Sequence, residues 1–141
     1  MPATDSWAQV VLVVDDDEDI RELYAEALEL NGYDVLQARD GEAAVEIARV
    51  APVTDVVMDL DMPIMDGFAA TQALKQDPRT AHTPVVVVTG STQGEKLTRA
   101  RIVGCDALLS KPCPPDVVIL AIQHVLTGQP IPPPYSVFDD G

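Results

Sequence analysis

The chain has 141 residues, of which 47% are hydrophobic and 23% charged, so it is long enough for one domain with a sizeable core. Its formal charge of −14, from 23 acidic and 9 basic residues, argues against direct binding to nucleic acid or to an anionic membrane. No apolar stretch approaches the roughly 18 residues of a transmembrane helix, and residues 1–8 lack the basic start and apolar run of a signal peptide. We therefore expect a cytoplasmic protein that acts on protein partners.

The first half of the chain alternates strand-like apolar runs with helical patterns. Val10–Val14 is a five-residue apolar run, typical of a strand that is buried on both faces. From Asp17 onward apolar residues recur at helical spacing, and Asn31-Gly32 predicts the end of that helix. A short strand is expected at Asp34–Gln37 and a second helix at Gly41–Val50.

The second half continues the alternation with three more strand-like runs and three more helical patterns. The strands are expected at Thr54–Met58, Pro84–Val88 and Ala107–Leu109, and the helices at Phe68–Gln76, Thr92–Val103 and Pro115–Leu126. The prolines of the last helix stand at its start, where the missing backbone N–H is tolerated.

Five strands that alternate with five helices predict parallel pairing and right-handed crossovers. We expect a doubly wound α/β domain over residues 9–127, flavodoxin-like, with five parallel strands in the order 2-1-3-4-5. Residues 1–8 are interpreted as a flexible leader. Four of the 12 prolines fall in residues 128–141, which are interpreted as a tail or linker stub, in preference to an arm that carries Tyr135 and Phe138 onto a neighbouring subunit or partner.

Polar residues follow four of the predicted strands. Asp15-Asp16 follows the first strand, Asp59 the third, Thr89 the fourth and Lys111 the fifth. In an open α/β sheet ligands bind outside the carboxyl ends of the strands, at the point where the strand order reverses. In the predicted order that point lies between the first and third strands, so the acidic residues are expected to meet there.

Three carboxylates a few ångströms apart repel one another, by about 3 kcal/mol for each charged pair at roughly 5 Å and an effective dielectric constant near 20. A bound cation would relieve this repulsion, and Mg²⁺ prefers hard oxygen ligands and binds through a few carboxylates together with phosphate. Asp16 and Asp59 are the expected direct ligands, with Asp15 acting through water and Asp61 through its backbone carbonyl. Mn²⁺ is expected to substitute for Mg²⁺.

The same residues suit phosphoryl transfer onto a carboxylate. Asp59 would attack phosphorus to give an acyl phosphate, while the metal offsets the charge on one phosphoryl oxygen. The hydroxyl of Thr89 and the ammonium of Lys111 would serve the other two oxygens.

Several motifs together resemble the receiver domain of two-component response regulators, in particular the single-domain regulators of chemotaxis. The resemblance covers Val10 to Leu126 and rests on four pieces of sequence: Val11-Leu12-Val13-Val14-Asp15-Asp16-Asp17, Asp59-Leu60-Asp61-Met62-Pro63-Ile64-Met65-Asp66-Gly67, Val88-Thr89-Gly90 and Ser110-Lys111-Pro112. The resemblance implies that Asp59 is the phosphoacceptor and that Thr89 is the switch hydroxyl. It also implies that Lys111 binds the phosphate and that Lys111-Pro112 is a cis peptide.

The resemblance also implies partners. A sensor histidine kinase or a phosphotransfer protein would donate the phosphoryl group, and the receiver would signal to an unknown protein target. It would catalyse only its own phosphorylation and dephosphorylation, so it is not expected to be an enzyme in the ordinary sense. Self-association to a homodimer is left open.

Two positions depart from the family pattern. Receivers usually carry Tyr or Phe three residues before the lysine, and here that switch position is Leu108. Cys113 stands where Phe often follows the Lys-Pro pair. We expect the phosphorylation chemistry to survive both changes. Whether Leu108 preserves the usual coupling between a hydroxyl and an aromatic ring is left open.

Three alternatives to a stand-alone phosphorylated receiver remain. The chain could be a receiver excised from a hybrid kinase or a larger regulator, or an interaction module that works without phosphorylation. A remote alternative is a phosphohydrolase of the haloacid dehalogenase type, because Asp59-Leu60-Asp61 has a D-x-D pattern. That family would place the pattern on its first strand.

Overall fold

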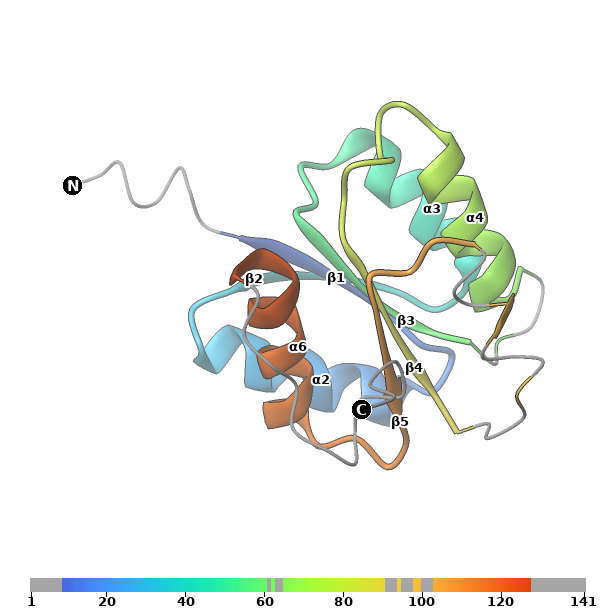
Figure 1. Cartoon of the computed structure of the whole chain (residues 1–141). Coiled ribbons are helices and arrows are strands. Elements are labelled where there is room, and N and C mark those ends of the chain that lie inside the picture. The colour runs from blue at the N-terminus through green and yellow to red at the C-terminus, as the bar shows by residue number, and fades with distance from the viewer. Residues whose placement is uncertain are drawn as a thin grey trace.

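A computed structural model describes residues 9–60, 62, 65–90, 94, 98–99 and 103–127 of the chain (Figure 1). The strands are β1 (Val10–Val14), β2 (Asp34–Ala38), β3 (Asp55–Asp59), β4 (Val85–Thr89) and β5 (Ala107–Ser110). The helices are α2 (Glu18–Leu30), α3 (Gly41–Val50), α4 (Gly67–Gln76) and α6 (Pro115–Thr127). The predicted leader, the predicted tail and most of the helix predicted at 92–103 lie outside the described residues.

All five strands pair in parallel, in the order β2-β1-β3-β4-β5. The predicted flavodoxin-like order is therefore confirmed. Strands β1, β3 and β4 form the centre of the sheet, and β3 and β4 are buried along their whole length. Their continuous valine-rich runs reflect this position, because a parallel strand that is covered on both faces has no polar side to alternate with.

Helices cover both faces of the sheet. In Figure 1, α2 and α6 lie together on one face, and α3 and α4 lie on the other. Alternate residues of β1 point to the two sides, so that Leu12 and Val14 join the core under α3 and α4, while Val11 and Val13 join the core under α2 and α6. Within the part of the chain that the structure describes, none of the helices combines the length and apolarity needed to cross a membrane.

Three helices begin at an aspartate whose side chain accepts hydrogen bonds from the first turn. Asp17 Oδ1 accepts from the backbone N–H groups of Asp19 and Ile20, at 3.0 and 3.2 Å. Asp40 caps α3 and Asp66 caps α4 in the same way. Such a cap contributes about 1 kcal/mol. Asp17 therefore marks the start of α2.

The amino end of β3 differs by one residue from the predicted start at Thr54. The hydroxyl of Thr54 accepts a hydrogen bond from the Val10 N–H at 2.9 Å and lies 3.1 Å from the Val10 carbonyl oxygen. Its side chain therefore bonds to the backbone of β1. The regular strand begins at the next residue, Asp55.

Asp55 is a fully buried carboxyl group at this amino edge of the sheet. Its Oδ2 atom lies 3.0 Å from the Thr54 hydroxyl, and its Oδ1 atom has no hydrogen-bond partner. Burial raises the pKa of Asp55 from 3.8 to about 6. The unpartnered oxygen and the raised pKa both indicate that the charged form is poorly accommodated.

We expect Asp55→Asn to stabilise the protein at pH 8. Because the folded-state pKa lies above the unfolded value of 3.8, the stability from the protonated form is present below pH 3.8 and is lost as pH rises through about 6. A neutral amide of the same shape avoids that loss, which is about 2–3 kcal/mol for a shift of this size. Urea unfolding of the variant and the wild type at pH 4 and pH 8 measures this difference in the free energy of unfolding.

A matched control is Asp34→Asn, which removes the same charge at an exposed position of β2. We expect that variant to match the wild type at both pH values. An Asp55→Asn variant whose stability relative to wild type does not rise between pH 4 and pH 8 would contradict the assignment.

Candidate functional site

The carboxyl ends of β1 and β3 bring the predicted acidic residues together. In the parallel register Val14 stands opposite Met58, so Asp15 and Asp59, the next residue of each strand, lie at the same level of the sheet. Asp59 is also the register partner of Val88 on β4. The site therefore lies where the sequence predicted it, at the point where the strand order reverses.

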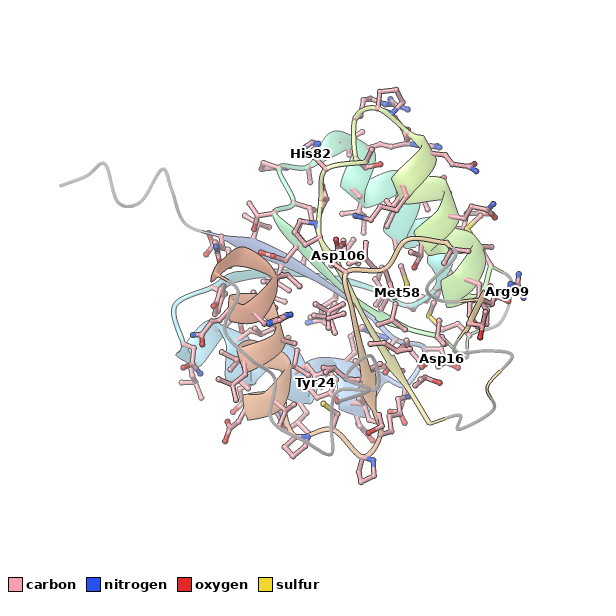
Figure 2. The ribbon with its side chains drawn as sticks, in the orientation of Figure 1. Asp16, Tyr24, Met58, His82, Arg99 and Asp106 are labelled. Atoms are coloured by element: carbon pink, nitrogen blue, oxygen red, sulfur yellow. The ribbon has the colours of Figure 1, made fainter. Side chains whose placement is uncertain are left out.

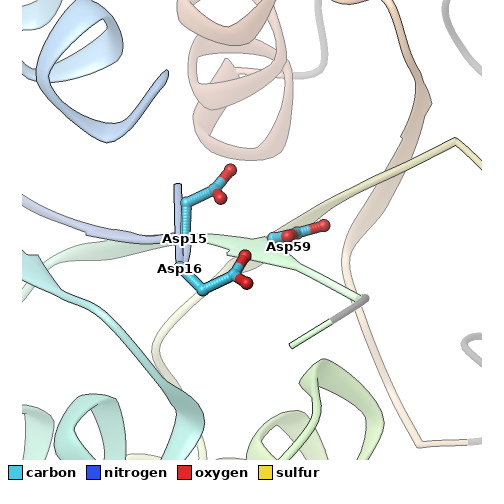
Figure 3. Close-up of side chains that lie close together, drawn as sticks. All are labelled: Asp15, Asp16 and Asp59. Carbon is cyan, nitrogen blue, oxygen red and sulfur yellow. The ribbon is translucent and has the colours of Figure 1, made fainter. Parts of the chain in front are cut away.

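Asp15, Asp16 and Asp59 form one acidic cluster. Each offers a carboxylate oxygen, and these oxygens all lie within 4.8 Å of one another. Figure 3 shows the side chains of Asp16 and Asp59 extending to the same side of the sheet edge, with Asp15 beside them. Asp15 and Asp59 are buried and Asp16 is exposed, so the cluster opens to solvent on one side.

The electrostatics of Asp15 reflect this crowding. Burial raises its pKa from 3.8 to about 6, and the nearby charges of Asp59 and Asp16 act in the same direction. A hydrogen bond of 2.9 Å from the Asp17 N–H to Asp15 Oδ1, together with the charge of Lys111, lowers the pKa again but only in part. A divalent cation would favour the ionised form in the same manner as Lys111, and more strongly.

Lys111, the residue directly after β5, reaches the cluster. Its Nζ atom lies 3.0 Å from Asp59 Oδ1, and the side chains of the lysine and the aspartate are 29% and 4% exposed. The Lys111 N–H donates to the Thr89 carbonyl oxygen at 2.8 Å, which holds the lysine beside the end of β4. The peptide between Lys111 and Pro112 is cis, as the resemblance implied.

The remaining predicted site residues are placed as follows. Thr89 ends β4, is fully buried and is the register partner of Ser110, so it lies one residue beyond the level of Asp59. Leu108 is fully buried in β5 and packs in the core under α3 and α4. Asp61, whose carbonyl was predicted to bind metal, lies outside the described residues.

Two residues that support the site were not predicted from sequence. Arg21 donates from Nη1 to the Asp15 carbonyl oxygen at 2.9 Å and from Nε to Gln37 at 2.9 Å, and so fixes the backbone at the end of β1. The hydroxyl of Tyr24 donates to the Cys113 carbonyl oxygen at 2.7 Å, which holds the loop after Lys111 against α2. Tyr24 lies on the α2–α6 side of the sheet (Figure 2).

The start of α4 lies close behind Asp59. The Gly67 N–H donates to the Leu60 carbonyl oxygen at 3.1 Å, and the Leu60 N–H donates to the Val88 carbonyl oxygen at 3.3 Å. Phe68, the next residue of α4, has the guanidinium carbon of Arg99 4.4 Å from its ring centroid, and Figure 2 shows Arg99 beside this end of the molecule. The backbone after Asp59 is therefore anchored to both β4 and α4.

The donor set fits a hard divalent cation. Three carboxylates that converge from two strands, one of them open to solvent, match the few-carboxylate sites that Mg²⁺ prefers. Burial is the main cause of the raised pKa of Asp15, and the charges of Asp59 and Asp16 add to it, so a cation at this cluster would favour the ionised form. Asp15, Asp16 and Asp59 are the described residues that could hold it.

We expect Mg²⁺ to raise the melting temperature at pH 8, because the ion binds the folded cluster and not the unfolded chain. At 100 times its dissociation constant it would add about 2.7 kcal/mol. The gain should shrink as pH falls below about 6, where Asp15 takes up a proton that competes with the metal. Calorimetry with Mg²⁺ and with EDTA measures it, and an equal gain in Asp16→Asn would count against this site.

Comparison with known proteins identifies the family of the chain. The family model described as response regulator receiver domain matches residues 11–123. The polar-differentiation response regulator DivK of Brucella anthropi is 33% identical over 102 residues, which is 72% of this chain and 83% of DivK.

Solved structures agree with the family model. The chemotaxis protein CheY4 of Vibrio cholerae superposes with a TM-score of 0.79 at 32% identity, over 84% of this chain and 98% of CheY4. The signal receiver domain of a signal transduction histidine kinase from Syntrophus aciditrophicus gives a TM-score of 0.80 at 29% identity, over 86% of this chain and 92% of that one. Asp59 ends the third strand, not the first, so the haloacid dehalogenase alternative is not supported. The chain belongs to the response regulator receiver domains.

Proposed function

We propose that the chain accepts a phosphoryl group on Asp59 in a Mg²⁺-dependent reaction and signals through a changed affinity for a protein target. The observation that carries the proposal is the site itself. A buried carboxylate is paired with a lysine at 3.0 Å and lies within 4.8 Å of two further carboxylates. A nucleophile, a cation and a set of metal ligands are thereby grouped at one sheet edge.

The roles of the residues follow from their positions. An oxygen of Asp59 forms the new bond to phosphorus as the bond from phosphorus to the donor breaks. Bound Mg²⁺ supplies charge neutralisation for a phosphoryl oxygen. Lys111 and the Thr89 hydroxyl serve the remaining oxygens, and Lys111 exchanges its contact with Asp59 for one with the phosphoryl group. Asp61 is proposed as a further ligand through its backbone carbonyl.

The donor proposed for the reaction is a phosphohistidine. Receiver domains interact with sensor histidine kinases or phosphotransfer proteins and with downstream targets, and the relatives found here are regulators of this kind. On this proposal the chain is cytoplasmic and is a signalling protein whose only catalysis is its own phosphorylation and dephosphorylation. A receiver that forms part of a larger kinase is the second candidate, favoured by the histidine kinase receiver among the structural neighbours.

Signal output is proposed to proceed from Thr89. Leu108 fills the β5 position of the switch with an aliphatic side chain that is already fully buried. An inward swing of an aromatic ring therefore has no counterpart here. Instead, movement of Thr89 toward the phosphoryl group would alter the packing beside β4 and β5, and through it the face that a target contacts.

The test is intact mass after incubation with acetyl phosphate. We expect one added phosphoryl group in the presence of Mg²⁺ and none in EDTA. Mn²⁺ should restore the adduct. Absence of the adduct, when a known receiver is labelled in parallel, would favour an interaction module that works without phosphorylation.

A further inference from the structure

An apolar groove of about 440 Å³ lies between α2 and the loop that follows Lys111. Its lining consists of Ile20, Leu23, Tyr24, Lys111, Pro112 and Cys113. Leu23 is 54% exposed although it is a large apolar residue on a helix. The thiol of Cys113 is buried, and burial raises its pKa to about 11, so this wall of the groove is uncharged at neutral pH.

The surroundings of the groove restrict what can occupy it. The residues that precede Ile20, from Asp16 to Asp19, are all acidic and all exposed, and α2 exposes Glu22 and Glu26 as well. In a chain of net charge −14 an acidic occupant would be repelled. The groove therefore suits an apolar segment without negative charge.

The chain itself contains such a segment. Residues 128–135, which follow α6 directly, read Gly-Gln-Pro-Ile-Pro-Pro-Pro-Tyr and contain no charged side chain. Proline-rich segments favour an extended polyproline II conformation and dock into grooves lined by apolar and aromatic residues. Because they are stiff, they lose little conformational entropy on docking.

Residues 128–135 are long enough to reach from the end of α6 back to the groove. Helix α6 has 13 residues and is about 20 Å long; it begins two residues after Cys113, beside the groove, and ends at the opposite end. Eight residues of polyproline II span about 25 Å, which is long enough to reach from the end of α6 back to the groove. Gly128 directly follows α6 in the sequence, and glycine is the residue most often found just after a helix.

We propose that residues 128–135 fold back along α6 and that Tyr135 occupies the groove formed by Leu23, Tyr24 and Pro112. The proposal concerns the unphosphorylated chain and does not depend on phosphoryl transfer, so its failure and a failure of the proposed function can be told apart. It places an intramolecular arm against the loop that carries Lys111, whose ammonium group pairs with Asp59.

The test is nuclear magnetic resonance on the full chain with labelled Leu and Ile methyl groups. We expect nuclear Overhauser effects between a tyrosine ring and the Leu23 methyls that disappear in Tyr135→Ser. That variant separates the Tyr135 signal from that of Tyr24, which also lines the groove. The Leu23 and Ile20 methyl resonances should shift in Tyr135→Ser and should remain unchanged in the matched variant Val137→Ser.

A mixed sample distinguishes the source of the tyrosine. Equal amounts of methyl-labelled and ring-labelled protein give the contact only if the arm comes from a second copy. Contacts within one molecule support the proposal. Contacts found only between molecules, or no contact from Tyr135 at all, would overturn it.

Discussion

Replacing Gly67 by Ala is expected to destabilise the protein by about 3 kcal/mol or more, the upper range for overpacking. A Cβ atom at this position would lie 2.3 Å from the Asp59 carbonyl oxygen and 2.7 Å from Leu60 Cα. Both atoms belong to the backbone that leads out of β3, so neither can rotate away. Relief of the clash requires α4 to move from the sheet or the backbone of Asp59 to shift.

The expected loss can be measured by urea unfolding of Gly67→Ala beside Gly90→Ala. Among the residues that the structure describes, a Cβ atom on Gly90 would meet only Lys111 Cβ and Cδ, both at the ordinary contact distance of 4.0 Å. We expect Gly90→Ala to stay within about 1 kcal/mol of wild type. Equal stability of the two variants would show that α4 adapts to the added methyl group. If Gly67→Ala does not fold at all, the prediction is met in its extreme form.

The fold could be predicted from the sequence because strand and helix signals agree with the final packing. Val10–Val14 and Gly41–Val50 were predicted with the bounds that the structure has, since a β-branched run and a helical stripe each bury one continuous surface. The strand at Thr54 was displaced by one residue because the Thr54 side chain bonds to the backbone of β1. A side-chain bond of that kind leaves no trace in hydrophobic periodicity.

The residues of the site also fall into those that could be predicted from sequence and those that could not. Asp15, Asp59 and Lys111 could be placed from sequence, because parallel strands bring their carboxyl ends to one edge whatever the details of packing. Arg21 and Tyr24 could not. Tyr24 read as one residue of a helical stripe, and its bond to the Cys113 carbonyl joins positions 89 residues apart, which depends on how α2 meets the loop after β5.

Asp55 illustrates a further limit of the sequence. It stands at the start of a β-branched run, where an acidic residue is commonly solvated, yet it is fully buried with one oxygen unpartnered. Within the described part of the chain, two carboxyl groups thus have a pKa raised to about 6, Asp55 at the amino edge of the sheet and Asp15 at the carboxyl edge. A bound cation can offset the unfavourable free energy of the buried charge on Asp15. Among the described residues, the Thr54 hydroxyl is the hydrogen-bond partner of the Asp55 carboxyl group. Protonation is therefore the simplest way to remove the buried charge of Asp55.

Asp59→Asn is expected to have two opposite effects, loss of phosphorylation and a gain in stability without metal. An amide nitrogen or neutral amide oxygen cannot form the acyl phosphate, so no phosphoryl adduct should appear with acetyl phosphate and Mg²⁺. The same change removes one of three carboxylates within 4.8 Å of one another. It also removes the ion pair with Lys111, but that lysine is 29% exposed and can turn to solvent or toward Asp15.

Because the charge of Asp59 contributes to the raised pKa of Asp15, its removal should bring that pKa closer to the ordinary value. We therefore expect a higher melting temperature than wild type at pH 8 in EDTA, and a smaller gain on adding Mg²⁺, since one ligand is missing. Intact mass and calorimetry on the same samples test both effects, with Asp34→Asn as a control that keeps the adduct. A lower melting temperature in EDTA would mean that the ion pair between Lys111 and Asp59 outweighs the repulsion among the carboxylates, and that the lysine, with no metal present, is enough to hold the cluster together.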